Sequence, residues 1–314
     1  MLPHRMSSSL AIVGAGRVGR ALGRRLHTLG WSIGVVATRS ITTARAAVHA
    51  IGAGQPTDRL TRQVVAANVA LIATPDDAIR HAAEGLAQIG GEEWRGKVVL
   101  HTSGALDSSA LEPLARAGAA TGSLHPMQTF SNQNMPELAG SMFGIEGSAA
   151  ALKVARKMVR QMGGVAVKLS GVNKAAYHAA GSFASAHALT LVEAGTRLLM
   201  AQGFTRRQAT RALLPLTRQT LDNLERLGPR AAWTGPMARG DYATVERHTE
   251  ALADFSRGFF DAYASVSRLA AVLLSDDPKA ALQQLQSALD RRLGPLPRKK
   301  GNGRLIDPGA KGNS

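Results

Sequence analysis

The sequence of 314 residues contains no cysteine and few aromatic residues, and its basic residues outnumber its acidic ones. The absence of cysteine excludes disulfide bonds, thiolate nucleophiles and thiolate zinc sites, and it is compatible with a cytoplasmic protein. No apolar run approaches the roughly 20 residues of a membrane-spanning helix. Residues 1–8 lack the apolar core of a secretory signal, so we expect a cytoplasmic location.

Lysine and arginine give the chain a net charge of +16, part of which lies in residues 298–314. This charge is compatible with contact to nucleic acid, or with a solvated basic surface that attracts an anionic cofactor and substrate. The basic residues are not interleaved with aromatic ones as in single-strand binders, which favours the second interpretation. Residues 294–314 are rich in Pro, Gly, Lys and Arg and lack periodicity, so we expect a disordered basic tail.

The stretch after residue 9 predicts a dinucleotide-binding turn. An apolar run at 10–13 leads into Gly14-Ala15-Gly16-Arg17-Val18-Gly19, which has the pattern G-x-G-x-x-G. The first glycine of this pattern permits a tight turn, the second lets a pyrophosphate approach the backbone, and the third allows a helix to pack closely. The N-terminus of that helix then favours the phosphates. We therefore expect residues 14–19 to bind the cofactor.

The end of the second predicted strand indicates which dinucleotide is bound. In NAD-preferring sites this strand usually ends in an acidic residue that binds the ribose hydroxyls and repels a 2′-phosphate. Here the strand ends in Thr38-Arg39-Ser40, a guanidinium between two hydroxyls, which suits a phosphate dianion. We therefore predict NADP(H) as cofactor, the alternative being that Arg39 is only an exposed residue at a helix start.

Strand and helix patterns alternate as far as about residue 170, and the pattern is helical beyond it. Strands are expected at 10–13, 31–37, 68–73, 98–101, 121–124, 142–146 and 165–169, and helices at 41–51, 149–162, 174–202, 205–227, 241–275 and 278–293. Residues 52–56 are expected to form a loop. The alternation predicts an α/β fold with a doubly wound Rossmann-type sheet, followed by an all-helical C-terminal domain. The expected boundaries are 8–170 for the NADP-binding domain, 171–293 for the helical substrate or dimerisation domain, and 294–314 for the tail.

Three predicted strands end in polar residues. In such folds ligands bind at the carboxyl edge of the sheet, where Thr74-Pro75, His101 and His125 are expected to lie. Thr74, Pro75 and His101 are candidate cofactor contacts, and the two aspartates that follow Pro75 are expected to cap the next helix. Ser103 and Gly104 are candidate substrate contacts, with a turn at a strand end as the alternative for Ser103. His125 is a candidate acid/base or a turn residue.

The first helix of the second domain carries further candidates. Lys174, Tyr177, His178 and Ser182 share one helical face among small residues. As an ammonium, Lys174 can polarise a substrate C=O and protonate the alkoxide during hydride transfer, whereas a solvated charge is the alternative. Arg239, in a constrained loop before a helix, is either a carboxylate clamp or a partner of Asp241. No metal-ligand spacing is present.

Five motifs together resemble one bacterial family of Rossmann-like oxidoreductases whose C-terminal helical domain was long catalogued as a domain of unknown function. They are Gly-Ala-Gly-Arg-Val-Gly at 14–19, His-Thr-Ser-Gly-Ala at 101–105, Gly-Ser-Leu-His-Pro at 122–126, Lys-Ala-Ala-Tyr-His-Ala-Ala at 174–180 and Thr-Gly-Pro-Met-Ala-Arg-Gly-Asp at 234–241. The layout is similar to the 6-phosphogluconate dehydrogenase-like group, which includes 3-hydroxyisobutyrate dehydrogenases, pyrroline-5-carboxylate reductases, ketopantoate reductases and prephenate dehydrogenases.

This resemblance implies roles for three residues. Lys174 matches the catalytic lysine of hydroxyacid dehydrogenases, although His178 replaces their asparagine four residues on. Ser103 matches their substrate-contacting serine, and His125 resembles the substrate-contacting histidine of prephenate dehydrogenases. The resemblance implies an NADP(H)-dependent oxidoreductase that transfers a hydride to or from a small 2-oxo or hydroxy acid, with ketopantoate as the first candidate and a homodimer formed through the helical domain.

Three alternatives remain open at this point. The first is a decarboxylating enzyme like prephenate dehydrogenase, with the chemistry on His125. The second is an NADP-binding sensor without turnover, and the third is nucleic-acid binding through the basic tail.

Overall fold

The computed structural model describes residues 9–131 and 135–290. The chain divides into two compact units, residues 1–188 and 189–314, and each is described by itself. The predicted boundary at 171 is where the strands end, but the first unit also includes the helix from Lys174 to Ser182. That helix belongs to it because Lys174 and Tyr177 hydrogen-bond side chains at the end of a strand. The predicted tail at 294–314 lies outside the described residues.

The first unit is built on one sheet. Its strands are β1 (Ser9–Val13), β2 (Ser32–Ala37), β3 (Gln55–Thr57), β4 (Val69–Ile72), β5 (Val98–His101), β6 (Ala120–Pro126), β7 (Met142–Gly147) and β8 (Val165–Lys168). Their order in the sheet is β3-β2-β1-β4-β5-β6-β7-β8. The pairs from β3 through β6 are parallel, β7 is antiparallel to β6, and β8 is parallel to β7. The strand order reverses between β1 and β4, and ligands bind at the carboxyl ends of strands at such a point.

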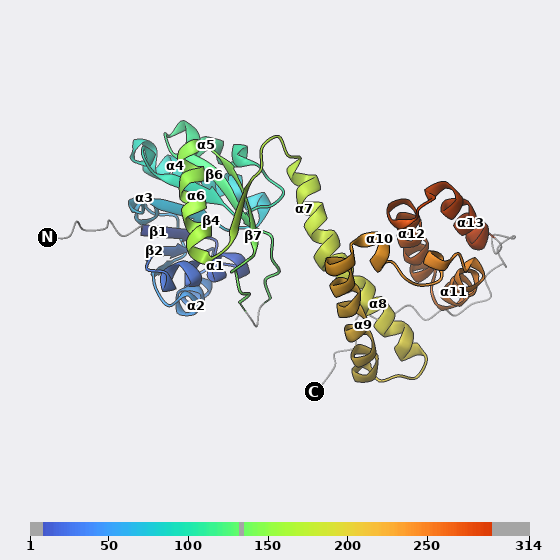
Figure 1. The fold of residues 1–314 in the computed structure, drawn as a ribbon. Coiled ribbons are helices and arrows are strands. Elements are labelled where there is room, and N and C mark those ends of the chain that lie inside the picture. Colours follow the sequence, from blue (N-terminus) through green and yellow to red (C-terminus); the bar gives the residue numbers. More distant parts are fainter. Residues whose placement is uncertain (1–8, 132–134, 291–314) are drawn as a thin grey trace. The chain divides into compact units, whose positions relative to one another are not determined.

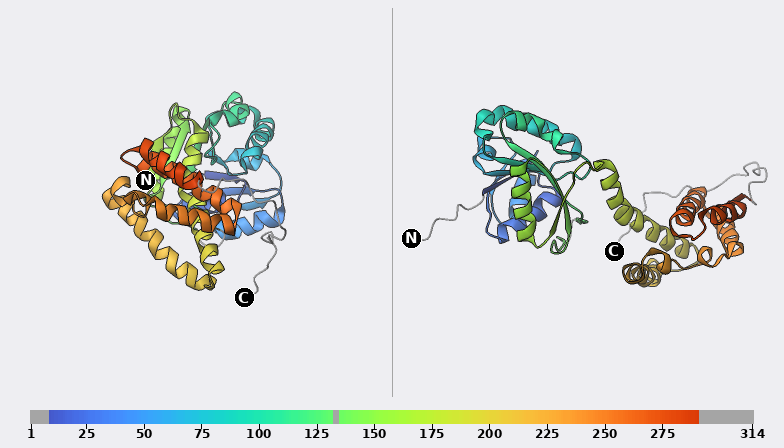
Figure 2. Two further views of the ribbon diagram at one scale, coloured as in Figure 1. Left: turned by 90° about the vertical axis from the view of Figure 1, so that its right-hand side faces the viewer. Right: turned by 45° about the horizontal axis from the view of Figure 1, so that its top comes forward.

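Helices cover both faces of this sheet (Figure 1). They are α1 (Arg17–Thr28), α2 (Ile41–Ile51), α3 (Arg62–Ala66), α4 (Asp76–Gly90), α5 (Glu112–Arg116) and α6 (Ala149–Met162), with short 3-10 turns η1 (Gly91–Trp94) and η2 (Ser108–Leu111). The side chains of β1 alternate between two cores, since Leu10 and Ile12 pack with α1, α2 and α6, whereas Ala11 and Val13 pack with α3, α4 and α5. In Figure 2, α6 lies beside α1 on one face.

The predicted Rossmann-type α/β sheet is confirmed, with two local differences. The predicted loop at 52–56 instead enters the edge strand β3, whose residues pair with β2 from Val35 to Ala37. The predicted strand at 121–124 is longer and runs to Pro126, because the antiparallel partner β7 extends its pairing. The added residues bring His125 into the sheet.

The C-terminal part of the chain is helical, as predicted. Its elements are α7 (Lys174–Ser182), the π-helical segment η3 (Phe183–His187), α8 (Ala188–Ala201), α9 (Arg206–Leu227), α10 (Pro229–Ala232), η4 (Met237–Arg239), α11 (Tyr242–Phe255), α12 (Arg257–Leu274) and α13 (Pro278–Asp290). The helix predicted at 241–275 is interrupted at Ser256, whose backbone is extended, and α10 was not predicted. Helices α11, α12 and α13 enclose a small core that includes Val245, Ala264 and Leu285. Within the described ranges, no helix has the length and apolarity needed to cross a membrane.

Candidate functional site

Two of the three glycines in the predicted cofactor turn are required by packing. Gly14 has φ +82°, and a Cβ there would lie 2.6 Å from the backbone nitrogen of Thr74. At Gly19, a Cβ would lie 2.5 Å from the carbonyl oxygen of Gly14. A Cβ at Gly16 would meet nothing within 4 Å. The fold therefore does not require a glycine at 16, and the space beside it is open to a ligand.

Polar groups around this turn lack protein partners. Helix α1 begins after Gly16 without a side-chain cap and with no acidic residue in its first turn, whereas Ser40 caps α2 and Ser148 caps α6. At the end of β4, the Oγ1 atom of Thr74 is buried and has no hydrogen-bond partner among the described residues. Free N–H groups at a helix N-terminus and an orphaned hydroxyl fit the pyrophosphate of a dinucleotide.

The remaining residues predicted to bind the cofactor lie around the same edge. Ala15 is buried and Val18 half-buried, and Arg17 donates a hydrogen bond from Nη1 to the Phe130 carbonyl at 3.2 Å. Pro75 stands at the N-cap position of α4, directly after Thr74.

The predicted phosphate-recognition stretch ends β2. The hydroxyl of Thr38 donates to the Ser40 carbonyl at 2.8 Å, and the hydroxyl of Ser40 accepts from the backbone N–H of Thr43 at 3.4 Å. Arg39 is exposed and has no ion-pair partner in the described part of the chain. Its guanidinium is therefore available to an anion at the end of β2. The hydroxyls of Thr38 and Ser40 make hydrogen bonds within the turn itself.

His101 is fully buried, and both of its ring nitrogens are used inside the protein. Its Nε2 lies 3.0 Å from the carbonyl oxygen of Asp107, and its Nδ1 accepts from the N–H of Ser103 at 3.2 Å. Burial lowers the pKa of His101, so the ring is neutral at physiological pH. This geometry leaves no ring nitrogen for the cofactor contact that the sequence predicted.

Ser103 adopts the turn role that the sequence analysis left open. Its hydroxyl donates to Asp76 Oδ2 at 2.8 Å and accepts from the backbone N–H groups of Ala105 and Leu106. The geometry therefore lends no support to a contact between this hydroxyl and a substrate. The predicted capping by Asp76 or Asp77 is wrong: Pro75 occupies the N-cap position of α4 without a side-chain cap, because the carboxylate of Asp76 is directed to Ser103 instead.

Strand register brings together a buried charge network that includes Lys174. His101 on β5 is the Cα partner of Ser123 on β6, and Ser123 is the partner of Glu146 on β7. The ammonium of Lys174 donates to Ser123 Oγ at 3.3 Å and lies 4.0 Å from Glu146 Oε2. Glu146 Oε1 accepts from the N–H and the hydroxyl of Ser108. Burial lowers the pKa of Lys174, and the negative charge of Glu146 opposes this shift.

A second polar cluster adjoins it, formed by β6 and α7. His125 Nδ1 lies 3.0 Å from the hydroxyl of Tyr177, and the His125 ring lies edge-to-face with His178 at 5.8 Å between centroids. Two glycines make room for these rings. A Cβ at Gly144, the β7 partner of His125, would lie 2.6 Å from the Tyr177 hydroxyl oxygen, and one at Gly104 would lie 2.6 Å from His125 Nε2.

This cluster borders a pocket of about 290 Å³ within the first unit. Burial, followed by the neighbouring His178 and Lys174, lowers the pKa of His125 to about 4, so its imidazole is neutral at physiological pH. Burial also raises the pKa of Tyr177, which keeps its hydroxyl protonated. The pocket is lined by His125, Pro126, Met127, Gln128, Thr129, His178, Gly181, Ser182, Ala184 and Ser185.

Of the predicted catalytic residues, two line the pocket and one is buried next to it. His125 and His178 line the pocket, whereas Lys174 is 7% exposed beside it, with its ammonium 5.7 Å from the centre of the Tyr177 ring. Arg239 lies in η4 of the other unit, so its predicted substrate contact stays a prediction.

Sequence reasoning missed the roles of Glu146 and Ser123, and it placed Tyr177 on the right helical face without a function. The strand pattern at 142–146 gave no sign that β7 runs antiparallel to β6. That direction is what sets Glu146 opposite Ser123. An acidic residue in an otherwise apolar strand was the signal available.

Two family models match consecutive parts of the chain. Residues 2–126 match a Rossmann-like domain, and residues 141–270 match a domain of unknown function, DUF2520. No curated protein matches the sequence significantly. The two matches agree with the observed order, in which a Rossmann-type sheet is followed by helices.

Solved structures share this fold at low sequence identity. A candidate NADP oxidoreductase from Bacteroides fragilis has a TM-score of 0.70 and 22% identity, over 83% of this chain and 97% of that chain. An imine reductase from Myxococcus stipitatus in complex with NADP+ has a TM-score of 0.62 and 19% identity, over 88% and 99% of the two chains. A pyrroline-5-carboxylate reductase from Coxiella burnetii has a TM-score of 0.54 and 18% identity, over 91% and 97%. The chain therefore has the fold of these reductases.

Proposed function

We propose that this protein is an NADP(H)-dependent oxidoreductase that transfers a hydride between the cofactor and a C=O or C=N carbon of a small substrate. One observation carries the proposal. The uncapped turn at Gly16 and the orphaned hydroxyl of Thr74 follow β1 and β4, and His125 lies near the end of β6. These strands run parallel and end at one edge of one sheet. A dinucleotide bound across such an edge extends from the turn toward the ends of β5 and β6.

The cofactor assignment rests on charge and on the solved structures. Arg39 at the end of β2 offers a guanidinium that has no ion-pair partner among the described residues, where an NAD-preferring site usually has a carboxylate. The similar imine reductase was solved with NADP+, and the candidate oxidoreductase from Bacteroides fragilis is named for NADP. Residues 14–19, Thr38, Arg39, Ser40 and Thr74 would hold the cofactor, which supplies a hydride from its nicotinamide when bound.

The neutral imidazole of His125 is the group that we assign to the substrate. If the Tyr177 hydroxyl donates to Nδ1, the ring proton lies on Nε2, which has no hydrogen-bond partner among the described residues. That N–H can polarise a carbonyl oxygen or an imine nitrogen without adding a charge, which is how a neutral histidine acts as an electrophile. His178 adds a second ring to the same pocket.

Lys174 is the proposed general acid. Hydride transfer to a carbonyl leaves an alkoxide, and transfer to a neutral imine leaves an amide anion. Either must be protonated, and a buried ammonium with a lowered pKa is a stronger acid than a solvated one. Glu146 keeps this ammonium charged between turnovers, and Ser123 orients it. Arg239 remains the proposed clamp for a substrate carboxylate.

The substrate contains either a C=O or a C=N bond, and the screen described below distinguishes the two classes. The named structures include reductases of C=N bonds, whereas the sequence resemblance favoured an oxo acid with ketopantoate first. None of the structures named above is a ketopantoate reductase, so ketopantoate rests on that resemblance alone.

We also propose a homodimer formed through the helical unit. Large apolar side chains are exposed on α8, α9 and α12, and a second copy of the chain would cover them. They include Leu189, Leu191, Leu216, Leu221, Leu224, Leu227, Leu269, Val272 and Leu273.

The test is a titration with NADPH and NADH, followed by a screen of oxo acids, ketopantoate included, and small cyclic imines for loss of NADPH absorbance. Tight NADPH binding with turnover of one class is the expected result, and it decides between C=O and C=N. Binding without turnover on any compound would favour a sensor, whereas release of CO2 from a hydroxy acid together with reduction of added NADP+ would favour prephenate-type chemistry. Absence of binding to either cofactor would contradict the proposal at its base.

A further inference from the structure

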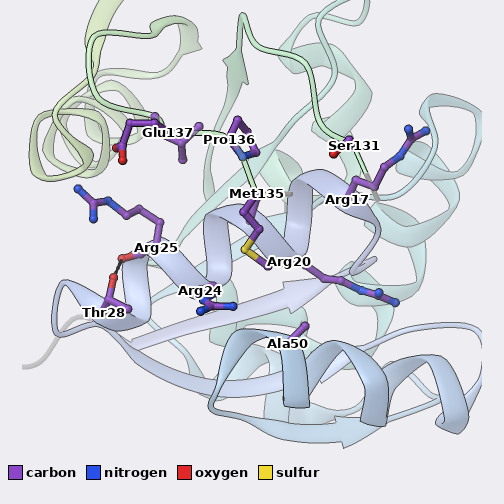
Figure 3. Close-up of a pocket in the computed structure, with 12 residues that line it drawn as sticks. Arg17, Arg20, Arg24, Arg25, Thr28, Ala50, Ser131, Met135, Pro136 and Glu137 are labelled. Carbon is purple, nitrogen blue, oxygen red and sulfur yellow. Dashed lines mark hydrogen bonds between the residues drawn. The ribbon is translucent and has the colours of Figure 1, made fainter. Parts of the chain in front are cut away.

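A cavity of about 660 Å³ lies along α1 (Figure 3), and it shares no lining residue with the pocket at His125. One wall is the face of α1 formed by residues three, four or seven positions apart. The opposite wall is the segment around Met135 and Pro136, which follows β6. The lining consists of Arg17, Arg20, Ala21, Arg24, Arg25, Thr28, Ala50, Ser131, Met135, Pro136, Glu137 and Leu138.

Four arginines give this cavity its charge. Within the described chain, none of them forms an ion pair, whereas arginines elsewhere do, such as Arg62 with Glu93 and Arg206 with Glu193. The carboxylate of Glu137 in the opposite wall accepts from the backbone N–H of Ala139 at 3.2 Å. Among the described residues, the lining of the cavity therefore carries four guanidinium groups against one carboxylate, which leaves it a net positive charge.

Two of these guanidinium groups are held in place by hydrogen bonds to backbone carbonyls. Arg17 donates to the carbonyl of Phe130 at 3.2 Å, and Arg20 donates from Nε to the carbonyl of Ala15 at 2.8 Å. The Nε of Arg25 is buried without a hydrogen-bond partner among the described residues. Guanidiniums that are fixed before binding lose less conformational entropy when they bind an anion.

The arrangement of the charges defines the ligand. In Figure 3, Arg17 and Arg20 point toward one end of the cavity and Arg25 toward the other, with Arg24 and the side chain of Met135 between them. Arg17 and Arg25 lie about 12 Å apart along the axis of α1, which is wider than a single phosphate. A concave site of this volume also suits a small molecule better than a polymer.

We propose that this cavity binds a small molecule that carries at least two phosphate groups, chiefly through Arg20, Arg24 and Arg25 on the flank of α1, and that Arg17 is the one lining residue it shares with the cofactor turn. Arg24 and Arg25 lie about two helical turns, roughly 10 Å, along α1 from Arg17. They line the flank of the helix, whereas the cofactor turn uses its N-terminal end. The ligand of this cavity would be a second polyanion in addition to the proposed cofactor, and its binding does not depend on the proposed oxidoreductase activity.

Calorimetric titration with tripolyphosphate at low salt tests the proposal, with inorganic phosphate as the weaker probe. The wild-type chain is expected to bind one tripolyphosphate more tightly than phosphate, with an affinity that falls as salt is added. The variant Arg24→Gln/Arg25→Gln should lose about tenfold or more in affinity, because two charge-assisted contacts are removed. Arg24→Gln alone, at an exposed side chain, should show a smaller loss.

Two control variants distinguish binding in this cavity from non-specific attraction to surface charge and from binding at the cofactor turn. Arg45→Gln/Arg156→Gln removes the same charge from exposed positions on α2 and α6 and should leave the affinity within about twofold. Gly16→Val places a side chain over the cofactor turn and should leave tripolyphosphate binding unchanged. Binding that survives Arg24→Gln/Arg25→Gln, or that is lost in Gly16→Val, would overturn the proposal. So would tighter binding of a single-stranded oligonucleotide with the same arginine dependence.

Discussion

The ammonium of Lys174 lies 4.0 Å from a carboxylate oxygen of Glu146, at the point where α7 meets the end of the sheet. Glu146 Oε2 is buried and makes no hydrogen bond within the described chain, so the lysine is its compensating charge. The lysine is 7% exposed and its carboxylate partner 21% exposed. Removal of either partner therefore leaves a poorly solvated charge, whatever the catalytic role of the pair.

Replacing Lys174 with Met is expected to lower turnover by about 10²–10⁴ while leaving NADPH affinity nearly unchanged. The same change should lower the free energy of unfolding by about 2 kcal/mol or more, because Glu146 loses its partner. Steady-state kinetics, cofactor titration and denaturant unfolding measure the three quantities.

The double variant Lys174→Met/Glu146→Gln separates catalysis from stability. Without the buried carboxylate, most of the lost stability should return, while turnover should stay low. Recovery of turnover together with stability would show that Lys174 acts only through packing, and unchanged turnover in the single variant would dispose of its role as an acid.

The glycines of the cofactor turn should respond differently to substitution. Gly14→Ala is expected to lower the free energy of unfolding by about 2 kcal/mol or more, because residue 14 has positive φ and its Cβ would contact the backbone at Thr74. Gly16→Val should leave the melting temperature within a few degrees, since a Cβ there meets open space. NADPH affinity should nevertheless fall about tenfold or more in Gly16→Val, because the side chain fills the place of the pyrophosphate. Unaltered affinity in a folded Gly16→Val protein would argue against a dinucleotide at this turn.

The sequence predicted the sheet well because its signals are local. A short apolar run followed by Gly14-Ala15-Gly16 reads as strand and turn without knowledge of any other segment, and the same holds for β5. The edge strand β3 was missed because only three residues form it and one of them is Pro56. Its pairing with β2, rather than its own pattern, makes it a strand.

The site was predicted only in part because its contacts are non-local. The helical face that joins Lys174, Tyr177 and His178 could be read from spacing, but the partners on β6 and β7 depend on register. The role of Ser103 illustrates the limit: its hydroxyl is committed to Asp76, 27 residues earlier, and no spacing rule predicts that bond.

Arg39→Asp is expected to invert the cofactor preference. In the wild type, the exposed guanidinium at the end of β2 should favour NADPH over NADH by an electrostatic contact to the 2′-phosphate. An aspartate should repel that phosphate and accept hydrogen bonds from the ribose hydroxyls of NADH. Fluorescence titration with both cofactors measures the ratio of dissociation constants, and Arg156→Asp, on exposed α6, controls for the change in net charge. Equal affinities of the wild type for the two cofactors would remove the basis of this assignment.

The protonation of His125 should make the fold sensitive to acid. Burial lowers the pKa of His125 from 6.5 to about 4, so between these pH values the unfolded chain binds a proton that the folded chain does not. Its contribution to the free energy of unfolding is therefore fully present above pH 6.5 and is lost as the pH falls toward 4. His101, whose pKa burial also lowers, acts in the same direction.

The melting temperature should thus fall between about pH 7 and about pH 5, and by less in His125→Asn than in the wild type. His49→Asn, at an exposed position on α2, should keep the wild-type pH dependence. An identical loss in His125→Asn and wild type would mean that the His125 imidazole is not held neutral by the fold, and its assignment as a neutral hydrogen-bond donor to the substrate would go with it.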